Sequence, residues 1–325
     1  MLTLEQNQLV FRFPEVHPDA VCSIEFQRTL RVPDDGKKYP LPPGLGRFPL
    51  RHIDDYATNV PDDWLKRGGV IMPMHQAEAM WIRFHSDYPC AVKVATGKVC
   101  AVSGDTWRGH LNRDPQDYVV TPTQPWLDGY CVEKGIIRQF VAMPLGQGYS
   151  VEEQLTGMGD VGGVQLLVYP MKRKAYETQR ARQEALVQPL ASKGMEMGIA
   201  PGGQMRQEIY DDPYGLEAWE QRRGIRCFVA VCNSPQWIGI TGECPPTEPP
   251  TARKYTDMGL PWFDYYDGDS KAIEGAVKLG KISSVVATAK KKEAKALPEN
   301  DSCEPADVRV IRRRRSDEVR EFGIW

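Results

Sequence analysis

Turn-forming residues constrain this chain more than any other feature of its sequence. Gly and Pro account for 55 of the 325 residues, about 17%, whereas about 12% is usual in globular proteins. Because both residues interrupt regular structure, the excess predicts short elements joined by many turns, with strands favoured over long helices. The remaining composition is that of a globular protein, since 41% of the residues are apolar and 26% are charged.

Alternation of apolar and polar residues in the first half of the chain indicates half-buried strands. Leu9–Phe13 and Cys22–Phe26 alternate or nearly alternate in this way. Cys90–Val94 and Lys98–Val102 flank a Gly-containing turn and read as a hairpin. The sequence therefore predicts a β-rich α+β fold of antiparallel hairpins or sandwich-like sheets, with one or a few surface helices and a C-terminal tail.

Two segments are candidates for helices. Between Met72 and Phe84 the pattern is ambiguous, and Pro73 would fit the first turn of a short helix running through Trp81. The clearest helix runs from Lys172 to about Val187 and has a strongly polar face, which is typical of a surface helix or a connector.

These elements divide the chain into four regions. We expect a β-rich region over residues 1–171, a helical connector over 172–189 and a second β-rich region over 190–284. The second β-rich region could belong to the same domain as the first. Residues 285–325 are rich in charges of both signs and poor in apolar groups until Val308, so we expect a flexible or docking tail there.

The charge and cysteine content favour a cytoplasmic protein. A net charge of −2 argues against binding nucleic acid or an anionic membrane with the whole surface. No apolar run is long enough to span a membrane, and the first residues lack the pattern of a secretory signal. Eight cysteines spread thinly over a chain of this size are typical of reduced thiols rather than a disulfide framework.

Two glycine-rich motifs are incomplete as cofactor sites. Gly157–Gly163 contains the G-x-G-x-x-G spacing of dinucleotide sites, but a strand-like segment follows it where a helix is needed, so a hairpin turn is the preferred interpretation. Gly275–Ile282 resembles a phosphate-binding loop but has Ile282 where a hydroxyl should bind magnesium. The histidines and cysteines also lack metal-site spacing. We therefore expect no cofactor and no metal.

Catalytic residues, if present, must be dispersed along the chain. Cys131 has charged neighbours, Asp128 lies close to it, and His75 and Glu78 would share one face of a helix. An enzyme built from these four residues predicts a concave pocket that gathers several of them.

Tryptophans next to prolines are the most distinctive recurring feature. Trp126, Trp237 and Trp262 lie in apparent loops. Large rings in loops usually fold back onto the core, which is the preferred interpretation. The alternative is a carbohydrate-binding or small-ligand-binding face.

The tail combines a strand-like segment with an apolar terminus. Val308 and Val310 alternate with arginines, and Phe322, Ile324 and Trp325 form an apolar cluster. Such a tail could pair with a neighbouring subunit or dock on its own body. We therefore expect a non-catalytic assembly or interaction protein, self-associating as a homo-oligomer or binding a protein partner through this tail. An enzyme of unknown reaction type and a carbohydrate or small-ligand module are the alternatives.

Overall fold

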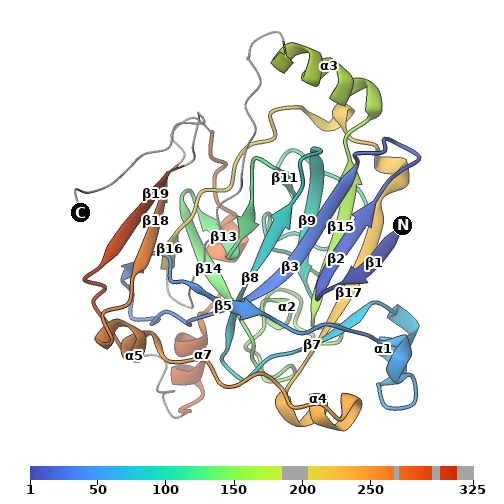
Figure 1. Cartoon of the computed structure of the whole chain (residues 1–325). Coiled ribbons are helices and arrows are strands. Elements are labelled where there is room, and N and C mark those ends of the chain that lie inside the picture. Colours follow the sequence, from blue (N-terminus) through green and yellow to red (C-terminus); the bar gives the residue numbers. More distant parts are fainter. Residues whose placement is uncertain (185–203, 267–270, 295–300, 313–325) are drawn as a thin grey trace, which may run out of the picture.

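The computed structural model describes residues 1–184, 204–266, 271–294 and 301–312. Within these ranges the chain forms a β-rich α+β fold, in which two large sheets enclose a core and short helices lie around them (Figure 1). The fold class expected from the sequence is confirmed.

The larger sheet has ten strands among the described residues, and all but one of its pairings are antiparallel. Its centre is the long pair β3–β8, which runs in register from Ser23 opposite His85 to Thr29 opposite Ala79. The strands are β1 (Leu2–Glu5), β2 (Gln8–Arg12), β3 (Val21–Thr29), β4 (Lys38–Tyr39), β5 (Gly44–Arg47), β8 (Ala79–His85), β12 (Trp126–Leu127), β13 (Gly129–Glu133), β14 (Ile136–Val141) and β16 (Gln204–Arg206).

The second sheet has seven strands in the described part of the chain. The predicted hairpin is confirmed here, because β9 and β10 pair antiparallel around Gly97 and Lys98. The strands are β6 (Arg51–His52), β7 (Val70–Pro73), β9 (Cys90–Thr96), β10 (Val99–Cys100), β11 (Val119–Thr121), β15 (Val164–Pro170) and β17 (Ile225–Cys232).

Both expected β-rich regions contribute strands to both sheets. In the second sheet β15 lies between β9 and β17, and β17 also pairs in parallel with β7. In the first sheet β16, from the later region, pairs with β14. The segments on either side of helix α3 (Arg173–Glu184) therefore share the same sheets.

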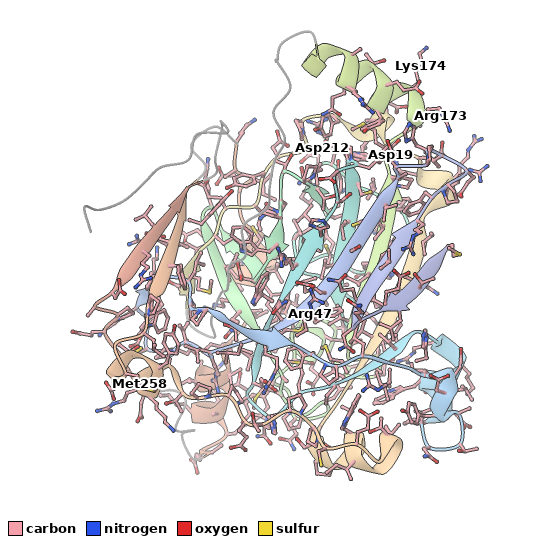
Figure 2. The ribbon with its side chains drawn as sticks, viewed as in Figure 1. Asp19, Arg47, Arg173, Lys174, Asp212 and Met258 are labelled. Carbon is pink, nitrogen blue, oxygen red and sulfur yellow. The ribbon has the colours of Figure 1, made fainter. Side chains whose placement is uncertain are left out.

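The main core lies between the two sheets. Buried side chains of the first sheet, such as Phe11 and Ile24, belong to the same apolar cluster as Val92 and Leu166 of the second. Each large apolar side chain buried in this way contributes about 1.5–3 kcal/mol to folding. Figure 2 shows side chains filling the space between the ribbons, whereas Met258, which is 65% exposed, projects at the periphery.

The helices are short and lie outside the sheets (Figure 1). Helix α3 confirms the helix predicted from Lys172 onward, and residues 185–189 lie outside the described ranges. No helix in the described ranges combines the length and apolar character needed to cross a membrane. The helices are α1 (Asp62–Arg67), α2 (Val151–Thr156), α3 (Arg173–Glu184), α4 (Ser234–Thr241), α5 (Ala252–Asp257), α6 (Val277–Gly280) and α7 (Val285–Lys291), with 3-10 turns at Asp54–Tyr56, Leu216–Ala218 and Gln221–Arg223.

The helix considered between Met72 and Phe84 is wrong. Pro73 ends strand β7, and Ala79–His85 is strand β8. Strand β8 lies between β3 on one side and β12 and β14 on the other, and most of its residues are buried. A central strand covered on both faces loses the alternation that marks a half-buried strand, which explains the ambiguous pattern.

The hairpin interpreted for Gly157–Gly163 is also wrong, although the strand expected after it is confirmed as β15. Helix α2 precedes the motif and begins with a capping box, in which Ser150 caps the Glu153 amide and the Glu153 carboxylate accepts the Ser150 amide. Gly157 ends the helix with φ of 76°, a left-handed conformation that glycine adopts without strain. The glycine-rich segment is therefore a helix-to-strand loop.

Part of the expected tail is structured. Ser284 caps helix α7, and β19 (Val308–Arg312) pairs in parallel with β18 (Trp262–Tyr266) of the same chain. Residues 308–312 thus dock on the protein's own body. The terminal residues Phe322, Ile324 and Trp325 lie outside the described residues.

Candidate functional site

A cavity of about 520 Å³ lies where the two sheets meet helix α2 and the segment before α7. Strands β8 and β14 line it from the first sheet, and β15 and β17 line it from the second. The volume is within the range of about 300–1,000 Å³ that is usual for small-molecule sites.

Most of the cavity wall is apolar. Met80 and Phe140 come from the first sheet, and Val164, Phe228 and Val231 come from the second. A few polar groups interrupt this wall, which is the pattern by which binding sites combine an apolar body with orientation of the ligand.

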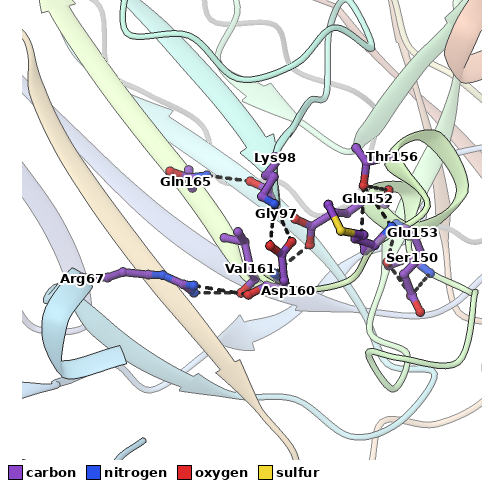
Figure 3. Close-up of polar contacts among 12 residues, drawn as sticks. Arg67, Gly97, Lys98, Ser150, Glu152, Glu153, Thr156, Asp160, Val161 and Gln165 are labelled. Atoms are coloured by element: carbon purple, nitrogen blue, oxygen red, sulfur yellow. Dashed lines mark hydrogen bonds and ion pairs between the residues drawn. The ribbon is translucent and has the colours of Figure 1, made fainter. Parts of the chain in front are cut away.

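Glu152 of helix α2 is the most unusual of these polar groups. Its side chain is buried, with the residue 1% exposed, and lines the cavity. One carboxylate oxygen, Oε2, accepts the Gly162 amide at 2.9 Å (Figure 3), whereas Oε1 has no hydrogen-bond partner among the described residues. Burying a charged oxygen without a partner is costly, so this oxygen requires an explanation.

The turn between β9 and β10 lies in close contact with the Glu152 side chain. Gly97 has φ of 53°, and a Cβ atom there would lie 2.2 Å from Glu152 Oε2. The loop that follows α2 is fixed by Asp160, whose carboxylate accepts from Lys98 at 2.6 Å and whose backbone oxygen accepts from Arg67 (Figure 3). These contacts hold the Gly162 amide in position and thereby orient the Glu152 carboxylate, which accepts from it.

Tyr130 and Thr96 add hydroxyls to the same wall of the cavity. Their oxygens are 2.7 Å apart, and either hydroxyl can donate to the other. Burial raises the pKa of Tyr130 well above its ordinary value, and the Glu152 carboxylate adds to the increase. The phenol is therefore neutral at physiological pH and retains its proton for hydrogen bonding.

Arg138 brings a positive charge to the part of the wall next to α7. It is half-buried on β14, and its Nη1 donates to the Ile282 backbone oxygen at 2.6 Å. Gln154 exchanges two hydrogen bonds with the Ser283 backbone, at 2.7 and 3.0 Å, and so ties α2 to this segment.

His75 lies at the other rim, beside the N-terminus of helix α4. Its Nδ1 is 3.1 Å from Ser234 Oγ, and its Nε2 is 2.7 Å from the Pro246 backbone oxygen. Glu78 accepts the His75 amide at 2.9 Å and forms a buried ion pair with Arg28 at 2.6 Å. Burial raises the pKa of Glu78, although Arg28 opposes the shift.

Of the four catalytic candidates, the structure brings together His75 and Glu78. Only His75 lines the cavity. Cys131 is 2% exposed in the core, and burial raises its pKa to about 12, which leaves the thiol protonated and unreactive at neutral pH. Asp128 is fully buried, its pKa is raised by burial, and it accepts the Trp126 indole N–H at 2.8 Å.

The three tryptophans lie in different surroundings. Trp237 and Trp262 are fully buried, in separate apolar clusters, and neither offers a ring face to a ligand in this conformation. Trp126 is half-buried and packs edge-on against Tyr265 at 4.7 Å. Together with Asp264 it lines a second cavity of about 430 Å³, which Val310 also borders.

Sequence reasoning missed Glu152, Arg138 and Ser234. The Ser150-x-x-Glu153 capping box was a readable signal for helix α2, and hence for the element that carries Glu152. Nothing comparable marks Arg138 or Ser234. In the part of the chain that the structure describes, no group of three or more His, Cys, Asp or Glu side chains is placed to hold a metal ion.

Comparisons of the chain with protein-family models, curated proteins and solved structures find no match.

Proposed function

We propose that this protein binds a small organic molecule in the cavity between its sheets. The ligand has an apolar body, which contacts the wall formed by Phe140, Phe228 and Val231, and a cationic amine or hydroxyl group, which donates to Glu152 Oε1. The single observation that carries this proposal is the buried carboxylate of Glu152 in the wall of a largely apolar cavity, one oxygen of which has no hydrogen-bond partner among the described residues.

The energetics favour a ligand with a donor at this position. A buried polar atom without a partner costs about 1–3 kcal/mol, and more when the group is charged. A donor from the ligand removes that cost and forms a charge-assisted hydrogen bond, which is roughly twice as strong as a neutral one. Contact with the apolar wall adds about 25 cal/mol for each Å² of apolar surface removed from water.

The test is a ligand-observed NMR screen of small apolar amines, alcohols and matched hydrocarbons against the full chain. We expect amines and alcohols to bind more tightly than the hydrocarbons. A Val231→Trp variant fills the cavity from β17 and should lose binding. An Ile238→Trp variant is the control, because Ile238 is 50% exposed on helix α4 and the added ring projects into solvent.

Equal binding to wild type and to the Val231→Trp variant would contradict the proposal, because the ligand would then lie elsewhere. Folding of each variant is checked by circular dichroism, and the Ile238→Trp variant must bind as wild type does.

Self-association through the C-terminal region is a second candidate function. Val308 and Val310 are 41% and 61% exposed on β19, whose outer edge has no paired strand among the described residues. An exposed apolar edge strand is a surface to which another strand can add. Light scattering of the full chain and of a variant carrying Val308→Lys and Val310→Lys tests this candidate; an unchanged mass excludes a role for this edge.

A further inference from the structure

We propose that Ser234 and His75 form a nucleophile–base pair that hydrolyses esters at the rim of the cavity. The acyl group of the ester lies in the cavity itself, and to that extent the inference rests on the proposed function. Neither residue's role follows from a sequence motif, because 159 positions separate them.

The hydrogen bonds around His75 define the tautomer of its neutral ring. The Pro246 carbonyl can only accept, so the 2.7 Å contact requires a proton on Nε2. In the neutral ring Nδ1 then carries a lone pair, and the Ser234 hydroxyl donates to it at 3.1 Å. A nucleophile, a base and a group that orients the base are thus linked in sequence, which is the arrangement expected of an activated serine.

The surroundings fix this pair in place. The buried carboxylate of Glu78 accepts the His75 amide, and Arg28, which is paired with Glu78, also donates to the Thr247 backbone oxygen at 2.5 Å. The segment that orients the imidazole and the segment that carries it are therefore bound to the same ion pair. Glu78 acts here as a positioning residue.

Ser234 occupies the first position of helix α4, directly after strand β17. Asn233 caps this helix and forms a capping box with Gln236. Pro235 has no amide hydrogen and the Gln236 amide is bonded to Asn233, which leaves the amide of Ser234 to face a developing negative charge. Asn233, which precedes Ser234, and Gln236, two positions after it, line the cavity, and so does His75.

The reaction needs only the ester and water. Ser234 Oγ attacks the ester carbonyl carbon while its proton passes to His75 Nδ1, and the bond to the leaving alcohol breaks as His75 returns the proton to that oxygen. Water then attacks the acyl-serine, giving its proton to His75 Nδ1, and the carboxylic acid leaves as the proton returns to Ser234 Oγ.

The experiment labels the folded full chain with an alkyl fluorophosphonate and locates the adduct by peptide mass spectrometry. We expect one adduct, on Ser234. Hydrolysis of p-nitrophenyl esters of increasing acyl length should vanish in Ser234→Ala and fall by about 10²–10⁴-fold in His75→Gln. Ser302→Ala is the matched control, because this serine is exposed and does not line the cavity, so the substitution should leave both readouts unchanged.

No adduct on folded wild type, or an adduct on another serine, overturns the inference, and this readout does not depend on whether any variant folds. The Val231→Trp variant separates the two proposals. If ligands bind wild type but not this variant while Ser234 stays unlabelled, the cavity binds without catalysis. If Ser234 is labelled and hydrolysis is the same for every acyl length in both proteins, the dyad is active but the cavity does not hold the acyl group.

Discussion

Replacing Glu152 by Gln should make the ligand-free protein more stable while removing its response to ligands. The substitution preserves size and can keep the hydrogen bond from the Gly162 amide, which is 2.9 Å from Oε2. It replaces a buried carboxylate, one oxygen of which has no hydrogen-bond partner among the described residues, by an amide, whose burial costs less.

The magnitude follows from the cost of an unsatisfied buried group. That cost is about 1–3 kcal/mol, and the amide retains part of it, so we expect a gain of about 1–2 kcal/mol. For a chain of this length each kcal/mol corresponds to roughly 2 °C in the melting temperature, which gives an increase of about 2–4 °C. A ligand at 100 times its Kd stabilises wild type by about 2.7 kcal/mol, and this increment should be largely absent in the variant.

Glu153, the next residue of helix α2, provides a control variant whose expected effect on stability has the opposite sign. Glu153 accepts hydrogen bonds from the amides of Gly148 and Ser150 and from the Ser150 hydroxyl. Desolvation opposes these bonds, but together they lower the pKa of Glu153. Glu153→Gln should therefore lower stability, by about 0.5–1 kcal/mol. Because the folded-state pKa is lowered, this difference is present above the ordinary pKa and disappears as the pH falls through the folded value.

Thermal unfolding followed by circular dichroism or calorimetry, with and without an apolar amine, measures both effects. A Glu152→Gln variant that is less stable than wild type would refute the reasoning, since the carboxylate would then be satisfied in the folded protein. A wild-type response to the amine in that variant would refute the assigned ligand contact.

Three further outcomes are expected. Glu78→Ala removes the charged partner of the buried Arg28 guanidinium and should lower the free energy of unfolding in urea by about 3–5 kcal/mol, whereas a loss under 1 kcal/mol would mean that the pair is not structural. Cys244 is exposed, whereas the other seven cysteines are buried, and burial raises the pKa of Cys227 and Cys232 to about 12. A thiol reagent at pH 8 should therefore modify one cysteine rapidly in the folded protein, and rapid modification of a second would contradict the described packing. Gly97→Ala introduces a Cβ against Glu152 and should abolish the stabilisation of the protein by ligand. Gly36 also has a positive φ but open space around it, so Gly36→Ala should only lower the free energy of unfolding by about 1 kcal/mol. Equal behaviour of the two variants would mean that Gly97 is not part of the site.

Local patterns in the sequence were sufficient where an element depends on its own residues. The hairpin around Gly97 was predictable because two apolar segments flank a turn that only glycine enters without strain. Helix α3 was predictable because its residues form a continuous polar, helix-favouring segment. In both cases the sequence signal and the structure arise within about fifteen neighbouring residues.

The same reasoning failed where distant strands decide the outcome. Most residues of strand β8 are buried because apolar clusters cover both faces of the strand, and its period of two is therefore lost. The cavity could not be predicted from local patterns, because Glu152, Arg138 and His75 lie in three separate segments of the chain and line the same cavity only through the packing of both sheets. His75 and Glu78 were paired by their spacing, but a loop rather than a helix joins them.

The most direct measurement is a crystal structure of the protein with the tightest-binding amine from the screen. We expect ligand density between β14 and β17, with the amine nitrogen about 2.7–3.2 Å from Glu152 Oε1 and the apolar body against Phe140 and Phe228. Density at another surface, or a carboxylate that remains without contact to the bound amine, would contradict the proposed binding site.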